Sequence, residues 1–377
     1  MSEYNQSPFE DLPEALVDEM LSQYRKLGHE LSRSFDEIRK ARDSIRESLK
    51  ALRLIKDDSE LICSHVYPTT CGVDGAYAVE RLLSTDIAAV AGVAVEGLTP
   101  PTENRLWPRP HHLCNIFTIR HHETTSLLIS AIMHCMELEL AIRAPHDVVF
   151  LDGSLTTPII RFNQAFNVMT EVPAYLSEIF LEKIRGSVDY YIEILHSTRS
   201  DKVYAGVPKY TTKNEISRKI DLGKHEDRSL LSFVLNAGEL VGPTDFELPE
   251  HWHINPPNWP SELRSKAAEI MQLIGELKIV YYRPYEYLPA FRIELPPSVS
   301  SNKNRLAVIL ESLQFQCGAP SIIEPYPLYL ADRMVKHLGT ALPALRKSAT
   351  NDMASSVSEQ LGNVFLAMHG YRTEYGR

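Results

Sequence analysis

The stretch VVFLDGSL, residues 148–155, ends an uncharged β-branched and aromatic run in a carboxylate, Asp152, which glycine follows at once. A second stretch, CGVDGAYAV at residues 71–79, places Asp74 in the same setting. Both patterns predict a hydrophobic strand that ends in Asp-Gly. Taken singly, Asp-Gly is more often a turn than a functional site. The two copies gain meaning only if the chain between them brings the aspartates together.

The chain around and between the two aspartates alternates predicted strands with one predicted helix. Segments rich in apolar and β-branched residues predict strands at 60–67, 86–98 and 113–120, and the proline-rich segment 99–112 predicts a loop. Residues 123–143 have the length and apolar content of a mostly buried helix. The order is therefore a strand with Asp74, further strands, a helix, and a strand with Asp152.

This order is the one in which a ribonuclease-H-like fold supplies carboxylates: an Asp on the first strand, a Glu on the first helix and an Asp at the end of a later central strand. Glu137 on the predicted helix supplies the middle member, with Glu139 as its rival on a different helical face. Two-metal phosphodiester hydrolysis needs such converging carboxylates, which hard cations such as Mg²⁺ and Mn²⁺ prefer as ligands. A partly buried Glu137 is explained equally well by a metal or by an ion pair.

Composition limits the class of protein. The chain has 377 residues, of which 44% are hydrophobic and 23% charged, as in an ordinary soluble globular protein. Residues 12–56 predict one long amphipathic helix, or two. The acidic start lacks the basic-then-apolar order of a secretory signal, and no run of about 18 uncharged apolar residues predicts a membrane span. The expected location is the cytoplasm.

The net charge of −10 excludes a stand-alone nucleic-acid binder with a broad basic face. Any contact with nucleic acid must use a local groove, metal ions or a partner. The pattern GxxxxGK[ST] is absent from the sequence, so the chain has no P-loop with which to hydrolyse ATP itself.

Several motifs, taken in order, resemble the NurA nuclease domain over residues 68–340. They are VDGAYA, ELELAIRA, VVFLDGSL, GVPK, DRSLL, YYRP, FRIELP and PYPLYLADRMVK. The resemblance implies a ribonuclease-H-like mixed central sheet flanked by helices and a homodimer. It also implies Mn²⁺-dependent processing of DNA ends and a partnership with a HerA-type hexameric ATPase. By matching position, Asp74, Glu137 and Asp152 take the catalytic, metal-binding roles.

Three further residues enter through this resemblance. Asp332, in PLYLADR, stands where the family's late histidine is expected, and it either binds the metal or pairs with Arg333 or Lys336. Lys209 in GVPK and Arg292 in FRIELP suit contacts to DNA phosphate, although Lys209 alone would be taken for a surface charge.

The sequence therefore predicts an α/β protein with an N-terminal helical segment (1–60), a nuclease domain (61–345) and a C-terminal segment (346–377). Its predicted function is Mn²⁺- or Mg²⁺-dependent DNA hydrolysis with two ions, in end processing for repair or in antiviral defence. The alternative is a catalytically weak adaptor on the ATPase ring. The helical segment and the loop around Trp252 and Trp259 are candidate docking surfaces, and the nearby His251 and His253 are interpreted as loop residues.

Overall fold

The computed structural model describes residues 9, 12–62, 67–82, 85–120, 122–248, 254–356 and 360. The strands of these residues join in one sheet with the order β1-β7-β8-β9-β6-β5-β2-β3-β4. The strands are β1 (Ile55–Asp57), β2 (Thr70–Arg81), β3 (Thr85–Glu96), β4 (His111–Arg120), β5 (Val148–Asp152), β6 (Val203–Val207), β7 (Glu239–Asp245), β8 (Lys278–Arg283) and β9 (Phe291–Leu295). The helices are α1 (Glu14–Ala51), α2 (Thr125–Arg143), α3 (Thr157–Val168), α4 (Ala174–His196), α5 (Asp227–Val234), α6 (Arg264–Gly275), α7 (Pro297–Ser300), α8 (Lys303–Gln316) and α9 (Tyr326–Ser356).

Five adjacent strands form the ribonuclease-H-like part of the sheet. Strands β2, β3 and β4 make an antiparallel meander. Strand β5 then lies parallel beside β2, and β6 lies parallel beside β5. The crossovers that this parallel pairing requires are α2 between β4 and β5, and α3 with α4 between β5 and β6. The predicted mixed sheet flanked by helices is confirmed.

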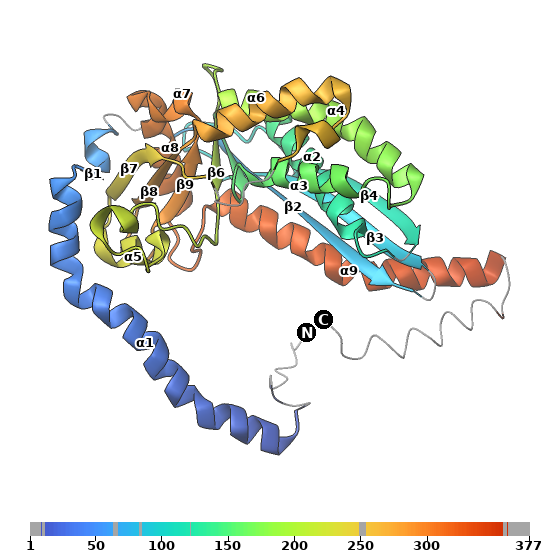
Figure 1. Cartoon of the computed structure of the whole chain (residues 1–377), viewed down its shortest axis with the longest axis horizontal. Helices are drawn as coiled ribbons and strands as arrows, with labels where there is room; N and C mark the ends of the chain where they lie inside the picture. Colours follow the sequence, from blue (N-terminus) through green and yellow to red (C-terminus); the bar gives the residue numbers. More distant parts are fainter. Residues whose placement is uncertain are drawn as a thin grey trace.

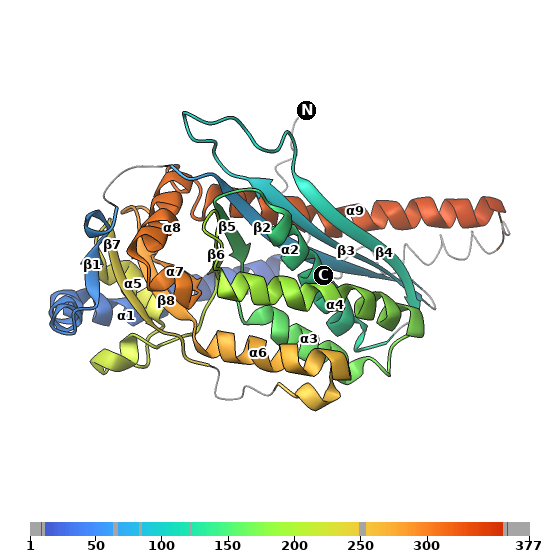
Figure 2. The same ribbon diagram turned by 90° about the horizontal axis from the view of Figure 1, so that it is seen from above.

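Helices cover both faces of the sheet (Figures 1 and 2). Helix α2 packs on β2 and β3 and is itself covered by α3 and α4, while α9 packs on the opposite face of the same two strands. Because α2 is enclosed on both sides, its sequence is apolar almost all round, as expected of a core helix. This helix is long and apolar enough to cross a membrane by composition alone, but 78% of its most apolar window is buried within the described structure.

The predicted N-terminal helical block is one helix, α1. Its C-terminal part packs on α5 and buries Ile38, Ile45 and Leu49. Its N-terminal part extends away from the sheet (Figure 1), and there Tyr24 and Leu27 are more than half exposed. Among the described residues, therefore, only the second half of this amphipathic helix packs on an apolar surface of the chain.

Three strand predictions need correction. Strand β2 does not end at the first Asp-Gly pair but continues through Gly75 to Arg81, because the antiparallel partner β3 pairs along its whole length. The predicted strand at 60–67 is not formed by its described residues: Glu60 belongs to a 3₁₀ turn, and residues 63–66 lie outside the described residues. Strand β4 also begins earlier than predicted, at His111.

Other predictions are placed as follows. His251, Trp252 and His253 lie outside the described residues. Trp259 is 1% exposed and donates its indole N–H to Asn163 Oδ1, so its predicted role as a docking residue is wrong. The predicted domain boundaries at residues 60 and 345 stay predictions. In the structure, β1, which precedes residue 60, pairs with β7, and α9 continues as one helix past residue 345 to Ser356.

Candidate active site

The two Asp-Gly stretches lie side by side in the sheet. Strands β2 and β5 are parallel, with Val73 opposite Leu151, so Asp74 and Asp152 are neighbours at the same level. Successive strand side chains point to opposite faces. Val73 and Leu151 belong to the core on the α2 side. Both aspartates therefore point to the other face, which α8 and α9 cover.

Helix α9 brings a third carboxylate to this pair. At the start of α9 the chain passes directly over β2, where a Cβ on Gly72 would lie only 2.5 Å from the carbonyl carbon of Pro327. The glycine thus allows the helix to approach the strand. One turn further along, Asp332 meets the two strand aspartates, and a ligand oxygen from each of Asp74, Asp152 and Asp332 lies within 4.8 Å of the others.

Glu137 reaches the same place from the opposite face of the sheet. A Cβ on Gly75 would lie 2.7 Å from Glu137 Oε1, so the missing side chain at Gly75 lets the carboxylate approach the strand beside Asp74. The other carboxylate oxygen, Oε2, lies 2.5 Å from His134 Nδ1. Glu139 instead pairs with Arg143 on the surface of α2. Of the two glutamates, the structure brings Glu137 to the aspartates, and Glu137 also has an ion-pair partner.

Lys209 lies between three of the carboxylates. It follows the end of β6, and its Nζ is 2.9 Å from Asp152 Oδ2, 2.9 Å from Asp332 Oδ1 and 3.0 Å from Glu324 Oε2. Burial alone would lower the pKa of Lys209, but these carboxylates together raise it above its ordinary value. Lys209 is therefore a permanent cation within the cluster and not a surface charge.

Glu324 is the member of this cluster that the sequence analysis missed. It lies in the loop immediately before α9, and its side chain is 19% exposed. The available signal was weak: an acidic residue near the start of the helix that bears Asp332. Asp332 itself pairs with Lys336 Nζ at 2.6 Å as well as with Lys209. The predicted ion pair with Lys336 is therefore present, and Asp332 also lies close enough to Asp74 and Asp152 to share a metal ion with them.

The clustered carboxylates outnumber the lysine ammonium groups beside them. The pKa values of Asp74 and Asp152 are accordingly raised. Burial and the nearby charges of Asp152 and Glu137 raise the pKa of Asp74 to about 8. Burial also raises the pKa of Asp152, although Lys209 opposes this. For Asp332 the effect of burial is outweighed by Lys336 and Lys209, which lower its pKa. A divalent cation among these oxygen donors would relieve the repulsion that raises the pKa of Asp74.

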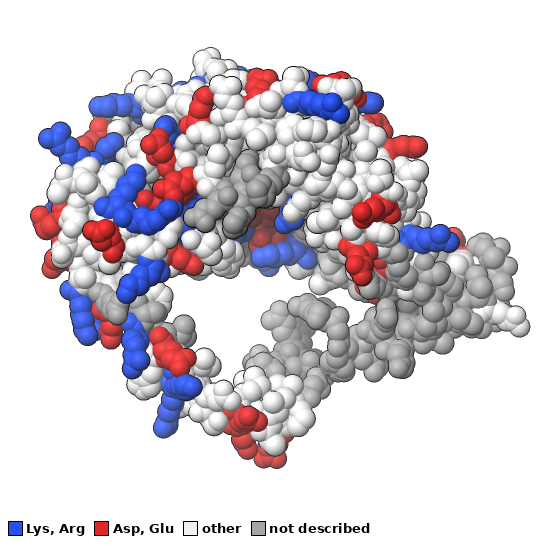
Figure 3. All heavy atoms as spheres, in the orientation of Figure 1, with Lys and Arg blue, Asp and Glu red and all other residues white. Residues whose placement is uncertain are grey.

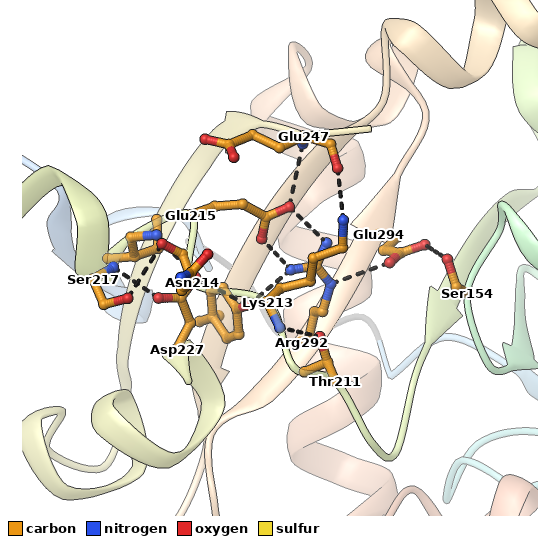
Figure 4. Close-up of polar contacts among 12 residues, drawn as sticks. Ser154, Thr211, Lys213, Asn214, Glu215, Ser217, Asp227, Glu247, Arg292 and Glu294 are labelled. Carbon is orange, nitrogen blue, oxygen red and sulfur yellow. Dashed lines mark hydrogen bonds and ion pairs between the residues drawn. The ribbon is translucent and has the colours of Figure 1, made fainter. Parts of the chain in front are cut away.

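Arg292 does not lie where a DNA contact requires it. The residue is 1% exposed, and its guanidinium pairs with Glu215 on one side and with Glu294 on the other. Figure 4 shows it enclosed by these two carboxylates. Its position contradicts the predicted contact to phosphate, because leaving two buried carboxylates unpaired is costly.

The network around Arg292 supports the site indirectly. Glu294 Oε1 accepts from Arg292, and its Oε2 accepts hydrogen bonds from Ser154 Oγ at 2.8 Å and from the Leu155 backbone N–H at 2.9 Å (Figure 4). Ser154 and Leu155 belong to the loop that follows Asp152. Glu294 therefore fixes the position of the loop that directly follows Asp152 at the end of β5.

Acidic and basic side chains lie together in a recess near the middle of the face seen in Figure 3. A hollow of about 210 Å³ adjoins the cluster and is lined in part by Lys209, Glu324 and Asp332. Glu324 and Asp332 are thus accessible from this hollow, and Asp74 and Asp152 lie next to Asp332.

Neither a protein-family model nor a curated protein sequence matches the chain. Solved structures of NurA nucleases are similar to it in fold, and three of them illustrate the likeness. The NurA nuclease from Sulfolobus solfataricus has a TM-score of 0.60 at 13% identity, over 92% of this chain and 99% of that one. A second NurA structure has a TM-score of 0.52 at 14% identity, over 90% and 99%. A NurA structure with manganese has a TM-score of 0.50 at 14% identity, over 84% and 98%. The chain has the fold of these nucleases over nearly its whole length.

Proposed function

We propose that the chain is a metal-dependent deoxyribonuclease that hydrolyses phosphodiester bonds. One observation carries this proposal: Asp74, Asp152 and Asp332 bring ligand oxygens within 4.8 Å of one another beside the half-buried Lys209, and Glu137 approaches the strand next to Asp74 from the other face of the sheet. Buried carboxylates repel one another, so a cluster of this kind needs a compensating cation. The fold of the NurA nucleases supports the same function.

The donor set fits a hard divalent cation, and the same four carboxylates would hold it. Such an ion supplies Lewis acidity at the scissile phosphate and makes water a stronger nucleophile. Asp74 must give up its proton before it can serve as a ligand. In the metal-free chain Lys209 pairs with Asp152 and Asp332. With ions bound it would keep its proton and present its ammonium group to a phosphate oxygen. Lys209 is therefore the residue that we propose to contact DNA.

We propose Mn²⁺ as the physiological metal, and one similar structure contains manganese. Mg²⁺ is the alternative metal, because the oxygen ligands suit it as well. We also propose two ions, as the sequence predicts. A second ion at Asp152 and Asp332 requires the Lys209 ammonium to move from between them. Calorimetric titration with Mn²⁺ measures the number directly, and a single ion per chain would contradict this part of the proposal.

The partners follow from the sequence motifs. We propose a homodimer in the cytoplasm that works with a HerA-type hexameric ATPase, which supplies the ATP-driven movement of DNA in repair or antiviral defence. The exposed apolar residues of α1 offer a contact surface for such partners. Light scattering gives the subunit number, and co-purification with the ATPase tests the partnership.

The deciding experiment incubates the purified chain with linear DNA and Mn²⁺. We expect cleavage that is lost in Asp74→Ala and in Asp152→Ala and kept in Glu139→Gln, whose side chain lies on the surface of α2. Normal cutting by both aspartate variants would refute the proposed site. Stable association with the ATPase but no cutting under any metal would favour the adaptor function instead.

A further inference from the structure

Two hollows meet beside the carboxylate cluster. The first, of about 210 Å³, lies against Asp332 and Glu324. The second, of about 530 Å³, continues toward α5 and the middle of α1. Lys209, Tyr210 and Arg228 line both. The two hollows therefore adjoin at these three residues, and together they are called the depression below.

Arg228 lies at the junction with spare hydrogen-bonding capacity. Its Nε donates to the Ala290 carbonyl oxygen at 3.3 Å, and none of the carboxylates in the described part of the chain forms an ion pair with it. Burial lowers the pKa of Arg228, and nearby Tyr210 and Glu324 offset this only in part. A half-buried guanidinium with free N–H groups suits a phosphate, which it binds in a bidentate manner.

Aromatic rings line the same depression. Tyr210 is 93% exposed although it directly follows Lys209, whose side chain is only 24% exposed. At the far end Phe35 of α1 and Phe233 of α5 are 38% and 43% exposed, and their ring centroids are 5.1 Å apart. Within the described residues, no hydrogen bond or ring contact of Tyr210 accounts for its exposed position beside the carboxylate cluster. Alternation of a cation with exposed rings is typical of surfaces that bind a single strand of nucleic acid, whose unstacked bases lie on the rings.

We propose that Tyr210 and Arg228 form a subsite for one unpaired DNA strand, which follows the depression from the carboxylate cluster toward Phe35 and Phe233. Arg228 binds a backbone phosphate, and Tyr210 stacks on the adjacent base. This proposal rests on the proposed nuclease function and adds its substrate class: the strand is single where it enters the site. It also explains how a chain with a net charge of −10 binds DNA, because the contact is confined to one lined path.

Fluorescence anisotropy with a labelled oligothymidylate in EDTA, where no cleavage occurs, tests the subsite. We expect Tyr210→Ala and Arg228→Ala each to weaken binding about tenfold. The salt dependence separates the two roles. Arg228→Ala should reduce the slope of log K against log salt by about 0.7, because one phosphate contact is lost, and Tyr210→Ala should leave the slope unchanged. Wild-type affinity in both variants, or an unchanged slope in Arg228→Ala, overturns the proposal.

Two variants serve as matched controls. Arg199→Ala removes an exposed arginine that pairs with Asp201, and Tyr287→Ala removes an exposed tyrosine; neither residue lines the depression. Both should bind the oligonucleotide like wild type. A blunt duplex should bind more weakly than the single strand and be indifferent to Tyr210→Ala. Equal losses for duplex and single strand would contradict the single-strand assignment.

The outcomes also separate this proposal from the nuclease function. If the wild-type chain cuts no DNA with Mn²⁺ but Tyr210→Ala and Arg228→Ala lose binding, the nuclease proposal fails and the subsite stands. If the wild-type chain cuts and both variants bind and cut like wild type, only the subsite fails.

Discussion

Asp74 lies buried beside two other carboxylates, and this raises its pKa from 3.8 to about 8. A carboxyl group with a raised pKa binds more protons in the folded state than in the unfolded state. The free energy of unfolding of the metal-free chain therefore falls as the pH rises from about 4 to about 8. The residue that the proposed metal site most needs is thus destabilising without the metal.

We expect Asp74→Asn to stabilise the metal-free chain at high pH, because asparagine carries no charge to bury. The gain should be on the order of 2 kcal/mol at about pH 8 and smaller at about pH 5. Urea unfolding in EDTA at the two pH values measures it. Equal gains at both pH values would show that charge is not the cause. The same variant should lose cleavage.

Lys209 is expected to matter both for stability and for activity. Lys209→Met leaves Asp152, Asp332 and Glu324 without their shared cation, which should cost about 2 kcal/mol in the metal-free chain at neutral pH. Cleavage with Mn²⁺ should fall about 100-fold, because a positive charge is lost where phosphate negative charge develops.

Lys336→Met is the matched control for Lys209. Lys336 also pairs with Asp332, but its side chain is 72% exposed. Exposed pairs contribute little, so the change in stability should stay within about 0.5 kcal/mol. Similar effects of the two substitutions would mean that position within the cluster does not matter.

At the scale of elements, glycines set how closely helices approach β2. Gly75→Ala would place a Cβ 2.7 Å from both Glu137 Oε1 and Met133 Cγ, so these two side chains, or α2 with them, must shift away from the strand. We expect a loss of about 2 kcal/mol of stability together with weaker Mn²⁺ binding, measured by thermal unfolding and by titration. Gly339→Ala in α9 meets nothing within 4 Å and should instead stabilise the chain by about 0.5 kcal/mol. Normal Mn²⁺ affinity in Gly75→Ala would contradict the proposed role of Glu137.

Because Arg292 on β9 is paired with two buried glutamates, we expect its removal to lower stability and to leave the affinity for DNA unchanged. Arg292→Ala leaves Glu215 and Glu294 buried and unpaired, which should cost about 3 kcal/mol or more. At a temperature where the variant is folded, its affinity for oligothymidylate should remain that of wild type. A selective loss of DNA affinity with unchanged stability would restore Arg292 as a DNA contact.

At the scale of the whole molecule, ion binding and folding are linked. The proposed Mn²⁺ site exists only where two strands and two helices meet, so Mn²⁺ should stabilise the folded chain by about 2.7 kcal/mol at 100 times its Kd. Thermal unfolding with increasing Mn²⁺ measures this shift. Affinity should increase up to about pH 8, because Asp74 must release its proton. A shift that persists in an Asp74→Ala and Asp152→Ala double variant would place the ion elsewhere.

Local pattern determined much of the fold. Alternation and β-branched content are set by neighbours in the chain, so β3, β4, β5 and the buried α2 follow from the sequence. Asp152 at the end of β5 follows likewise. The extent of β2 does not, because its residues after Gly75 are strand only through pairing with β3.

The sequence alone thus determined the order of Asp74, Glu137 and Asp152 along predicted elements, and the tertiary structure decided which side chains meet. Glu324 belongs to the carboxylate cluster because it pairs with Lys209, which is far from it in the chain. Arg292 is not a DNA contact because it is buried in a pair with Glu215, which is also distant in the chain. Lys209 has the same sequence signal as any surface lysine. Only the folded chain places three carboxylates within 3.0 Å of its ammonium nitrogen, and Coulomb energy depends on that distance and on burial, which no local pattern contains.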